Sequence, residues 1–207
     1  RCFPHVINIA VKSGLKELTD LPMYDPDIVL DDEDVPRKLV TACRASGQRR
    51  EAFENIIKAG NDAGGWGNPP QILRVFGLLK DVETRWSATF LMIDRVLEQY
   101  LAIDKFLADP QQEEISCHAF DSATLQVLQD IRRFLQIPHI VQEIVSAEKT
   151  PTLSIVLPMY EKLIVMLKDL AKDLAVISHA INATVGKLEE YLGKSRHTKM
   201  YSLAMGK

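Results

Sequence analysis

Apolar side chains recur at helical spacing along most of this chain, and that repeat restricts its fold more than any other feature. Between residues 86 and 101 the apolar positions form one helix face: Trp86, Phe90, Ile93, Leu97 and Leu101. The same spacing predicts helices over residues 3–18, from Pro36, from Ser46, over 84–108, over 121–148, from Thr152 and over about 176–194. Helices of this length favour a mainly α multi-helix bundle over an α/β sheet.

Capping and helix-breaking residues set the expected ends of these helices. Ser46, Thr84, Asp121 or Ser122, and Thr152 are expected to cap helix starts. Residues 20–36 hold three prolines and many acidic residues, and therefore predict a loop. NDAGGWGNPP at 61–70 stops any helix, and we interpret its GGWG as a flexible turn because it lacks the GK[ST] ending of a phosphate-binding loop. Pro138 and Pro158 fall inside predicted helices, and Pro138 is expected to kink its helix.

Composition agrees with a folded protein and excludes several classes. The chain has 207 residues, of which 46% are hydrophobic and 26% charged, with a net charge of −3. No apolar run approaches the roughly 20 residues of a membrane span, and no signal peptide is visible. Three widely spaced cysteines give no disulfide framework and indicate a reducing compartment, either cytosol or nucleus. The chain starts at Arg1 and ends just after an apolar run, so we expect it to be a piece of a longer protein.

Residues able to support catalysis or metal binding are few. Cys2 and His5 form a CxxH, which is half of a zinc site, but two more ligands are missing, so a structural thiol and a hydrogen-bonded imidazole are the favoured interpretation. Cys117 and His118 are adjacent and would point apart, and His139 beside Pro138 is expected at a kink. No GxSxG signature occurs, and DDED at 31–34 is interpreted as a solvated loop. We therefore predict no catalytic residue, no metal ligand and no cofactor in this chain.

Nucleic-acid binding is better supported by the residue pattern. Five basic residues within 14 positions could contact several phosphates: Arg37, Lys38, Arg44, Arg49 and Arg50. The alternative is that these residues only make the surface soluble. A second pair, Arg85 and Trp86, lies at a predicted helix start, where the indole could stack on an unpaired base while the guanidinium holds a phosphate. The alternative for Trp86 is a place in the core, with Arg85 as an ordinary surface residue.

Four segments together resemble the hAT superfamily (hobo/Activator-like) of DNA transposases, especially copies from fungal genomes. These segments are RCFPHVINIAV at 1–11, DVETRWSATFLMIDR at 81–95, LQIPHIVQEIVSAEKTPTLSIVLPMYEKLI at 135–164 and KLEEYLGKSRHTKMYSLAM at 187–205. The resemblance runs nearly end to end, and the combination of CxxH with a distant TRW is more specific than either motif alone.

This resemblance implies an RNase H-like core in which two Asp and one Glu bind divalent metal for DNA cleavage, with a large helical insertion before the Glu. It implies that residues 1–19 are a core helix that carries Cys2 and His5 as structural family motif residues. Residues 20–70 would be loops and basic helices, 71–197 an all-α insertion, and 198–207 a truncated return to the core. The three catalytic residues would lie outside the chain, and the divalent metal is implied only for the complete enzyme.

The resulting prediction is a transposase fragment, located in the nucleus, that binds DNA but does not cut it. The DNA partner would be a transposon end or a flanking hairpin, with Arg85 and Trp86 stabilising a flipped base by resemblance. The alternative is a transposon-derived protein-interaction module whose exposed helix faces bind a protein partner and which has no DNA role. Neither hypothesis involves a membrane.

Overall fold

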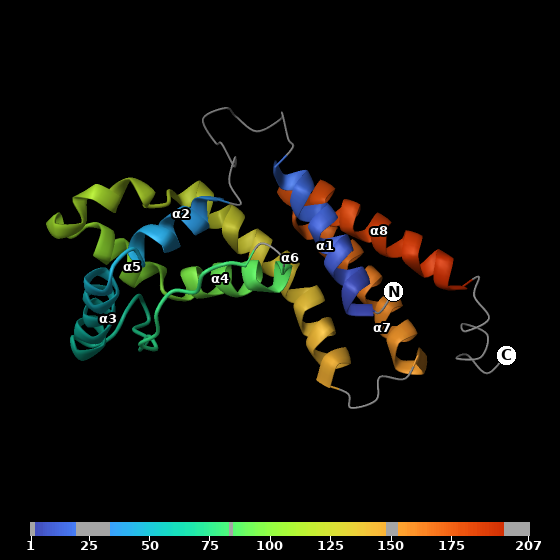
Figure 1. Cartoon of the computed structure of the whole chain (residues 1–207), viewed down its shortest axis with the longest axis horizontal. Coiled ribbons are helices and arrows are strands. Elements are labelled where there is room, and N and C mark those ends of the chain that lie inside the picture. Colours follow the sequence, from blue (N-terminus) through green and yellow to red (C-terminus); the bar gives the residue numbers. More distant parts are fainter. Residues whose placement is uncertain (1–2, 20–33, 83–84, 148–152, 197–207) are drawn as a thin grey trace. The chain divides into compact units, whose positions relative to one another are not determined.

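The computed structural model describes residues 3–19, 34–82, 85–147 and 153–196, and it is built from helices (Figure 1). Within these ranges the extended structure is limited to a single bridge between Trp66 and Gln71, so the mainly α prediction is confirmed. The α-helices are α1 (Phe3–Thr19), α2 (Asp34–Cys43), α3 (Gly47–Asp62), α4 (Trp86–Glu98), α5 (Tyr100–Leu107), α6 (Ser122–Ala147), α7 (Leu153–Asp173) and α8 (Ser178–Arg196), with 3-10 helices η1 (Pro110–His118) and η2 (Ala175–Ile177).

The chain divides into two compact units. Unit 1 comprises residues 1–24, 85–87 and 130–207, and unit 2 comprises residues 25–84 and 88–129. The units therefore follow packing rather than chain order, because α1 groups with the last helices. The boundaries predicted at residues 19, 70 and 197 separate core and insertion segments of the transposase family rather than compact units, and they stay predictions.

Unit 1 is organised by the packing of α1 along α8 (Figure 1). Gly14 makes this close approach possible, since a Cβ at that position would lie 2.0 Å from Thr184 Oγ1 and 2.6 Å from the Ala180 carbonyl oxygen. Glycine lowers intrinsic helix propensity, but at this position its lack of a side chain allows the contact between the two helices. Thr184 is buried and donates its hydroxyl to the Ala180 carbonyl at 3.1 Å, so no polar group is left unsatisfied there.

The buried face of α1 is wide. Val6, Ala10 and Leu15 are buried, whereas Ile9 is half-buried. Neighbouring apolar residues complete the buried face of α1: Ile7 and Val11. This helix contacts more than one neighbour, since Phe3 also packs edge-on against Tyr160 of α7, with ring centroids 5.2 Å apart.

Unit 2 has its own core, formed where α3 packs on α5. Phe53 and Phe106 meet edge to face there, with ring centroids 5.6 Å apart. Tyr100 binds the segment after η1 to α5 in the same unit. Its hydroxyl donates to the Phe120 carbonyl at 2.9 Å and accepts from the Phe120 amide at 2.8 Å. The two rings are also stacked at an angle of 9°. The segment after η1 is thus held by one side chain.

The single helix predicted over 84–108 is two helices, α4 and α5, because the helix is interrupted at Gln99. Gln99 is buried, and its amide donates to two backbone carbonyls, those of Arg74 and Phe76. Leu101 lies after this interruption, and the prediction that it shares the buried face is wrong, because 46% of it is exposed. Trp86, Phe90 and Ile93 are buried as predicted, and Leu97 is half-buried.

The loop over 63–70 is more ordered than the flexible turn that the sequence predicts. Trp66 is buried, and its ring packs so closely on Gly60 that a Cβ there would lie 2.1 Å from the indole. The Trp66 and Gln71 backbones exchange two hydrogen bonds of 2.9 Å. An indole that fills the space above a glycine fixes this turn against α3.

The capping predictions are confirmed where the structure describes the residues. The Ser46 hydroxyl accepts from the Arg49 amide at 3.1 Å, and the Asp121 carboxylate accepts from the Thr124 amide at 2.7 Å. Thr84 and Thr152 lie outside the described residues, as do residues 20–33 of the predicted loop and residues 197–207. Among the described helices, none is long and apolar enough to cross a membrane.

The exposed carboxylate of Glu190 should make the stability of unit 1 depend on pH. Hydrogen bonds from Lys187 and Lys194 lower the pKa of Glu190 from 4.5 to about 2. Because the folded-state pKa lies below the unfolded one, the stabilisation is complete above about 4.5 and is lost as the pH falls toward 2. Glu190→Gln should therefore melt at a lower temperature than wild type near neutral pH, and the two curves should converge in acid.

Thermal unfolding followed by circular dichroism across this pH range measures the difference. Glu51→Gln, which removes an exposed carboxylate from α3, is the control and should show no such convergence. Added salt should shrink the Glu190 effect, since the pair is exposed to solvent. A Glu190→Gln difference that persists unchanged into strong acid would contradict the assignment.

Candidate nucleic-acid interface

Trp86 is the first residue of α4, and its side chain is only 3% exposed. Its ring packs edge-on against His139 of α6, with the centroids 6.3 Å apart. Trp86 therefore lies in the core, which is the alternative to the base-stacking role. The described conformation leaves no open indole face on which a base could stack, because α6 covers the ring. His139, which the sequence places at a kink, is the packing partner.

Arg85 precedes Trp86 and is exposed. A buried indole next to an exposed guanidinium fixes the position of the backbone from which Arg85 extends. The residue also lies just before the amino terminus of a 13-residue helix, where the helix dipole favours an anion. The two residues of the TRW motif that the structure describes therefore have separate roles, one in packing and one at the surface.

The predicted basic group belongs to unit 2, and its arginines are engaged within the fold. Arg37 forms an ion pair with Asp81, whose side chain is 3% exposed, with nitrogen to oxygen distances of 2.5 and 2.7 Å. Asp81 also accepts from the Thr89 hydroxyl and from the Val82 amide. This carboxylate thus joins Arg37 of α2 to Thr89 of α4.

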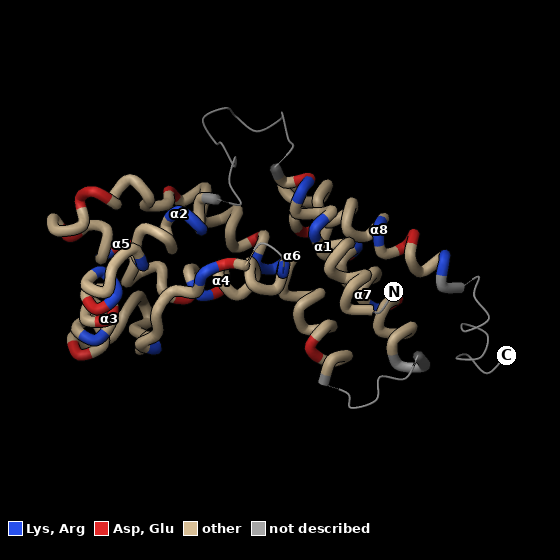
Figure 2. The backbone as a smooth tube through the Cα atoms, viewed as in Figure 1, with Lys and Arg blue, Asp and Glu red and all other residues tan. Residues whose placement is uncertain are grey.

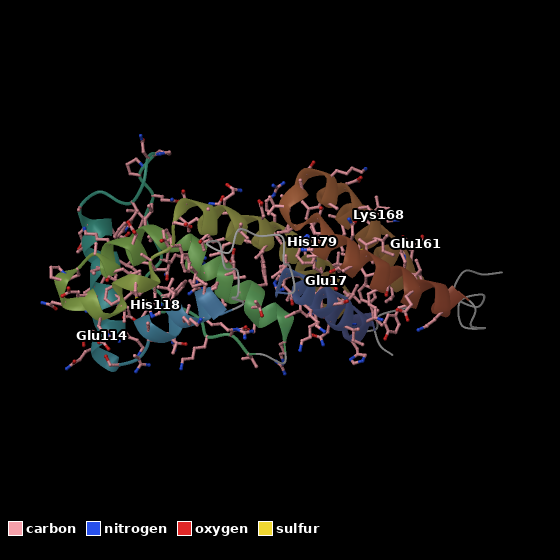
Figure 3. All side chains as sticks on the ribbon, turned by 90° about the horizontal axis from the view of Figure 1, so that it is seen from above. Glu17, Glu114, His118, Glu161, Lys168 and His179 are labelled. Carbon is pink, nitrogen blue, oxygen red and sulfur yellow. The ribbon has the colours of Figure 1, made fainter. Side chains whose placement is uncertain are left out.

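The other arginines of that group also bind groups of the protein itself. Arg44 donates to the Leu78 carbonyl, and Arg49 pairs with Glu114 of η1 at 2.6 Å. Glu114 is labelled in Figure 3. Arg50 is exposed and donates to the Ser46 carbonyl at 3.3 Å, while Lys38 is exposed. Charged residues of both signs also lie along α3 (Figure 2). The exposed members, Lys38 and Arg50, remain the best placed to meet a phosphate.

Residues 71–82, which we call the strap, form no helix and belong to unit 2. Gln71 pairs with the Trp66 backbone, and several carbonyl groups further along the strap are bound by side chains. Asn61 exchanges two hydrogen bonds with the Leu73 backbone, at 2.8 and 3.0 Å. Gln99 binds two further carbonyls, and Arg95 binds the Gly77 carbonyl at 3.3 Å. The strap is therefore anchored through its backbone.

The outer side of the strap is unusually apolar for a surface. Its exposed large hydrophobic residues are Ile72, Val75, Phe76, Leu79 and Val82. Two cations stand among them: Arg74 and Lys80. Sequence reasoning missed this surface, because the segment has neither helical nor alternating spacing. A signal was present in the cluster of apolar residues with interspersed cations just before TRW.

Metal and thiol chemistry find no support among the described residues. Within them, no group of three His, Cys, Asp or Glu side chains could hold a metal ion. His5 is exposed on α1, and Cys2 lies outside the described residues. Burial raises the pKa of the Cys43 thiol to about 12, which keeps it protonated, whereas Cys117 is exposed.

The fold and its basic residues define an all-α domain whose surface arginines are largely engaged in internal ion pairs and carbonyl contacts. A family model described as the ZBED1 RNase-like helical domain matches residues 1–134. Because this match covers more than half of the 207 residues, the chain belongs to that family, which is derived from hAT transposases. Comparisons with curated proteins and with solved structures give no match.

Membership of this family agrees with the resemblance to hAT transposases found in the sequence. The relation to hAT transposases that the four sequence segments imply is confirmed in this coarser form. The matched residues include both the TRW motif and the strap, and they end within α6.

Proposed function

We propose that this transposase-derived domain binds DNA, with Arg85 contacting the phosphate backbone and Trp86 anchoring that contact. The observation that carries the proposal is the pairing of an exposed guanidinium with a buried indole at the start of α4. A fixed backbone lowers the entropy that Arg85 loses when it orders on a phosphate. Membership of a family derived from DNA transposases supports the same conclusion.

Lys38 and Arg50 extend the proposal to unit 2, since both are exposed. Arg37, Arg44 and Arg49 were predicted alongside them, but their internal contacts mean that substituting them would also disturb the fold. Trp86 was predicted to stack on a flipped base, and burial favours an anchoring role for it instead. The fungal-type relation, the nuclear location and the structural role of Cys2 and His5 belong to the proposal as expectations.

The test is the salt dependence of DNA binding. Purified protein is titrated against a fluorescent DNA hairpin with an unpaired flanking base, and anisotropy is recorded over a salt series. Loss of one phosphate contact in Arg85→Gln should reduce the slope of log K against log salt by about 0.9, with weaker binding at every salt concentration. Lys172→Gln on α7 removes another exposed cation outside the predicted set and should leave the slope unchanged.

Equal changes in both variants would mean that only net charge matters and that Arg85 makes no particular contact. The expectation that the chain does not cut DNA is checked in the same mixtures by adding Mg²⁺ and following the DNA on a denaturing gel. Appearance of cleaved product that follows the protein through purification would contradict it.

A second function is favoured by a specific observation, the exposed apolar side chains of the strap. Surfaces of this kind often serve as protein contacts. The interaction-module alternative would place a protein partner on them and would leave Arg85→Gln without effect on any activity.

A further inference from the structure

We propose that Arg74, Phe76 and Arg95 form a stacking platform for an unpaired DNA base. This inference rests on the proposed DNA-binding function and adds to it the site where a base, rather than a phosphate, would be held. The sequence predicts a stacking role for Trp86, but Trp86 is buried, whereas Phe76 is an exposed aromatic residue that could take this role.

The platform consists of an aromatic ring with two guanidinium groups over it. The Arg74 and Arg95 guanidinium carbons lie 5.3 and 4.8 Å from the centroid of the Phe76 ring. Phe76 is 44% exposed, whereas the other phenylalanines of unit 2 are buried. Arg95 is largely covered, with 18% of its side chain exposed, and Arg74 is open, with 66% exposed. A ligand would therefore meet the Phe76 ring and the Arg74 guanidinium.

The members of the platform are held in position by a network of polar contacts. Glu98 accepts two hydrogen bonds from Arg74, at 2.9 and 3.2 Å, and lies 3.5 Å from Arg95 Nε. Gln99 binds the carbonyl groups of both Arg74 and Phe76. A surface aromatic residue that only filled space would not require this arrangement. Preorganised side chains lose little entropy on binding, which favours a ligand-binding role.

The charge and shape of the site select the class of ligand. Two guanidinium groups and one carboxylate leave the platform with a net positive charge, and Lys80 is exposed on the same strap. The neighbouring acid, Asp81, is covered and paired with Arg37. Bases stack both on aromatic rings and on arginine planes, and cations beside the ring attract the phosphate that follows each base. A single-stranded or flipped-out base satisfies both requirements.

The test compares single-stranded DNA with a fully paired duplex, using fluorescence anisotropy of the labelled oligonucleotides with the full chain. Phe76→Leu keeps an apolar side chain but removes the ring, and its affinity for single-stranded DNA should fall about 5- to 150-fold, with duplex binding little changed. Phe76→Trp should retain the affinity, and the new exposed indole should lose fluorescence as single-stranded DNA is added. The two native tryptophans are buried and provide the background.

Tyr191→Leu is the matched control. Lys194 lies 5.3 Å from the Tyr191 ring centroid, so this substitution removes an aromatic residue with its own cation from unit 1. It should leave single-stranded binding close to wild type. Circular dichroism verifies that every variant is folded.

Each outcome separates the two proposals. If wild type binds neither DNA, the proposed function fails and the platform fails with it. If wild type binds duplex DNA through Arg85 but Phe76→Leu binds single strands as well as wild type, only the platform is wrong. If Phe76→Leu instead abolishes self-association in sedimentation experiments while DNA affinity stays unchanged, the strap is a protein contact and the platform is again overturned.

Discussion

Trp86→Ala should lower the free energy of unfolding by about 3–5 kcal/mol, because it removes a large buried side chain from a packed core. Trp86 is 3% exposed and contacts His139 of α6, so truncation would leave a cavity between the start of α4 and that helix. Urea unfolding followed by circular dichroism measures the change. Trp86→Phe, which refills most of the space, should lose clearly less.

The same variant distinguishes the two roles that the sequence leaves open for Trp86. If the indole faced DNA, Trp86→Ala would unfold like wild type and would weaken hairpin binding by about 1–3 kcal/mol. If the indole is core, stability falls first, and DNA binding is lost only where the variant is unfolded. Measuring affinity and stability on one sample at several temperatures separates these results.

Gly14→Ala should destabilise unit 1 by about 2–3 kcal/mol, since the added methyl group has no room between α1 and α8. Its Cβ would lie 2.0 Å from the Thr184 hydroxyl oxygen and 2.6 Å from a backbone carbonyl, which cannot rotate away. The helices would have to separate, and this would loosen the packing around them. Thermal unfolding followed by circular dichroism gives the size of the loss.

Gly186→Ala is the control for helix propensity. Gly186 lies inside α8, and a Cβ there would meet nothing within 4 Å. The same substitution should therefore stabilise the protein by about 0.4–1 kcal/mol. Thr184→Ala combined with Gly14→Ala should recover part of the loss by removing the nearest contact. Destabilisation of similar size at both glycines would show that the close approach at Gly14 is not the cause.

Local patterns predicted most of the helices. The helix of residues 3–18, the caps at Ser46 and Asp121 and the helix over 121–148 follow from spacing and capping chemistry that involve only nearby residues. The break at Gln99 could not be found in this way, because the apolar repeat continues through it. Its cause is the bonding of a side chain to a segment about 25 residues earlier in the chain.

The candidate site was predicted less well for a related reason. Its arginines are visible in the sequence, but their partners are distant carboxylates and carbonyl groups, such as Asp81 for Arg37 and Leu78 for Arg44. Composition cannot tell an arginine that awaits a phosphate from one that already has a partner. The burial of Trp86 likewise depends on α6, which lies about fifty residues further along the chain.

The anchoring of the strap by its backbone has a consequence for how this surface can change over generations. Asn61, Arg95 and Gln99 bind peptide groups, which are the same for every amino acid. Substitutions at the outward positions Ile72, Val75 and Leu79 thus leave these contacts intact, whereas substitution of an anchoring residue removes the hydrogen bonds that hold residues 73–77. The domain can acquire new surface specificity at the strap without rebuilding the helices beneath it.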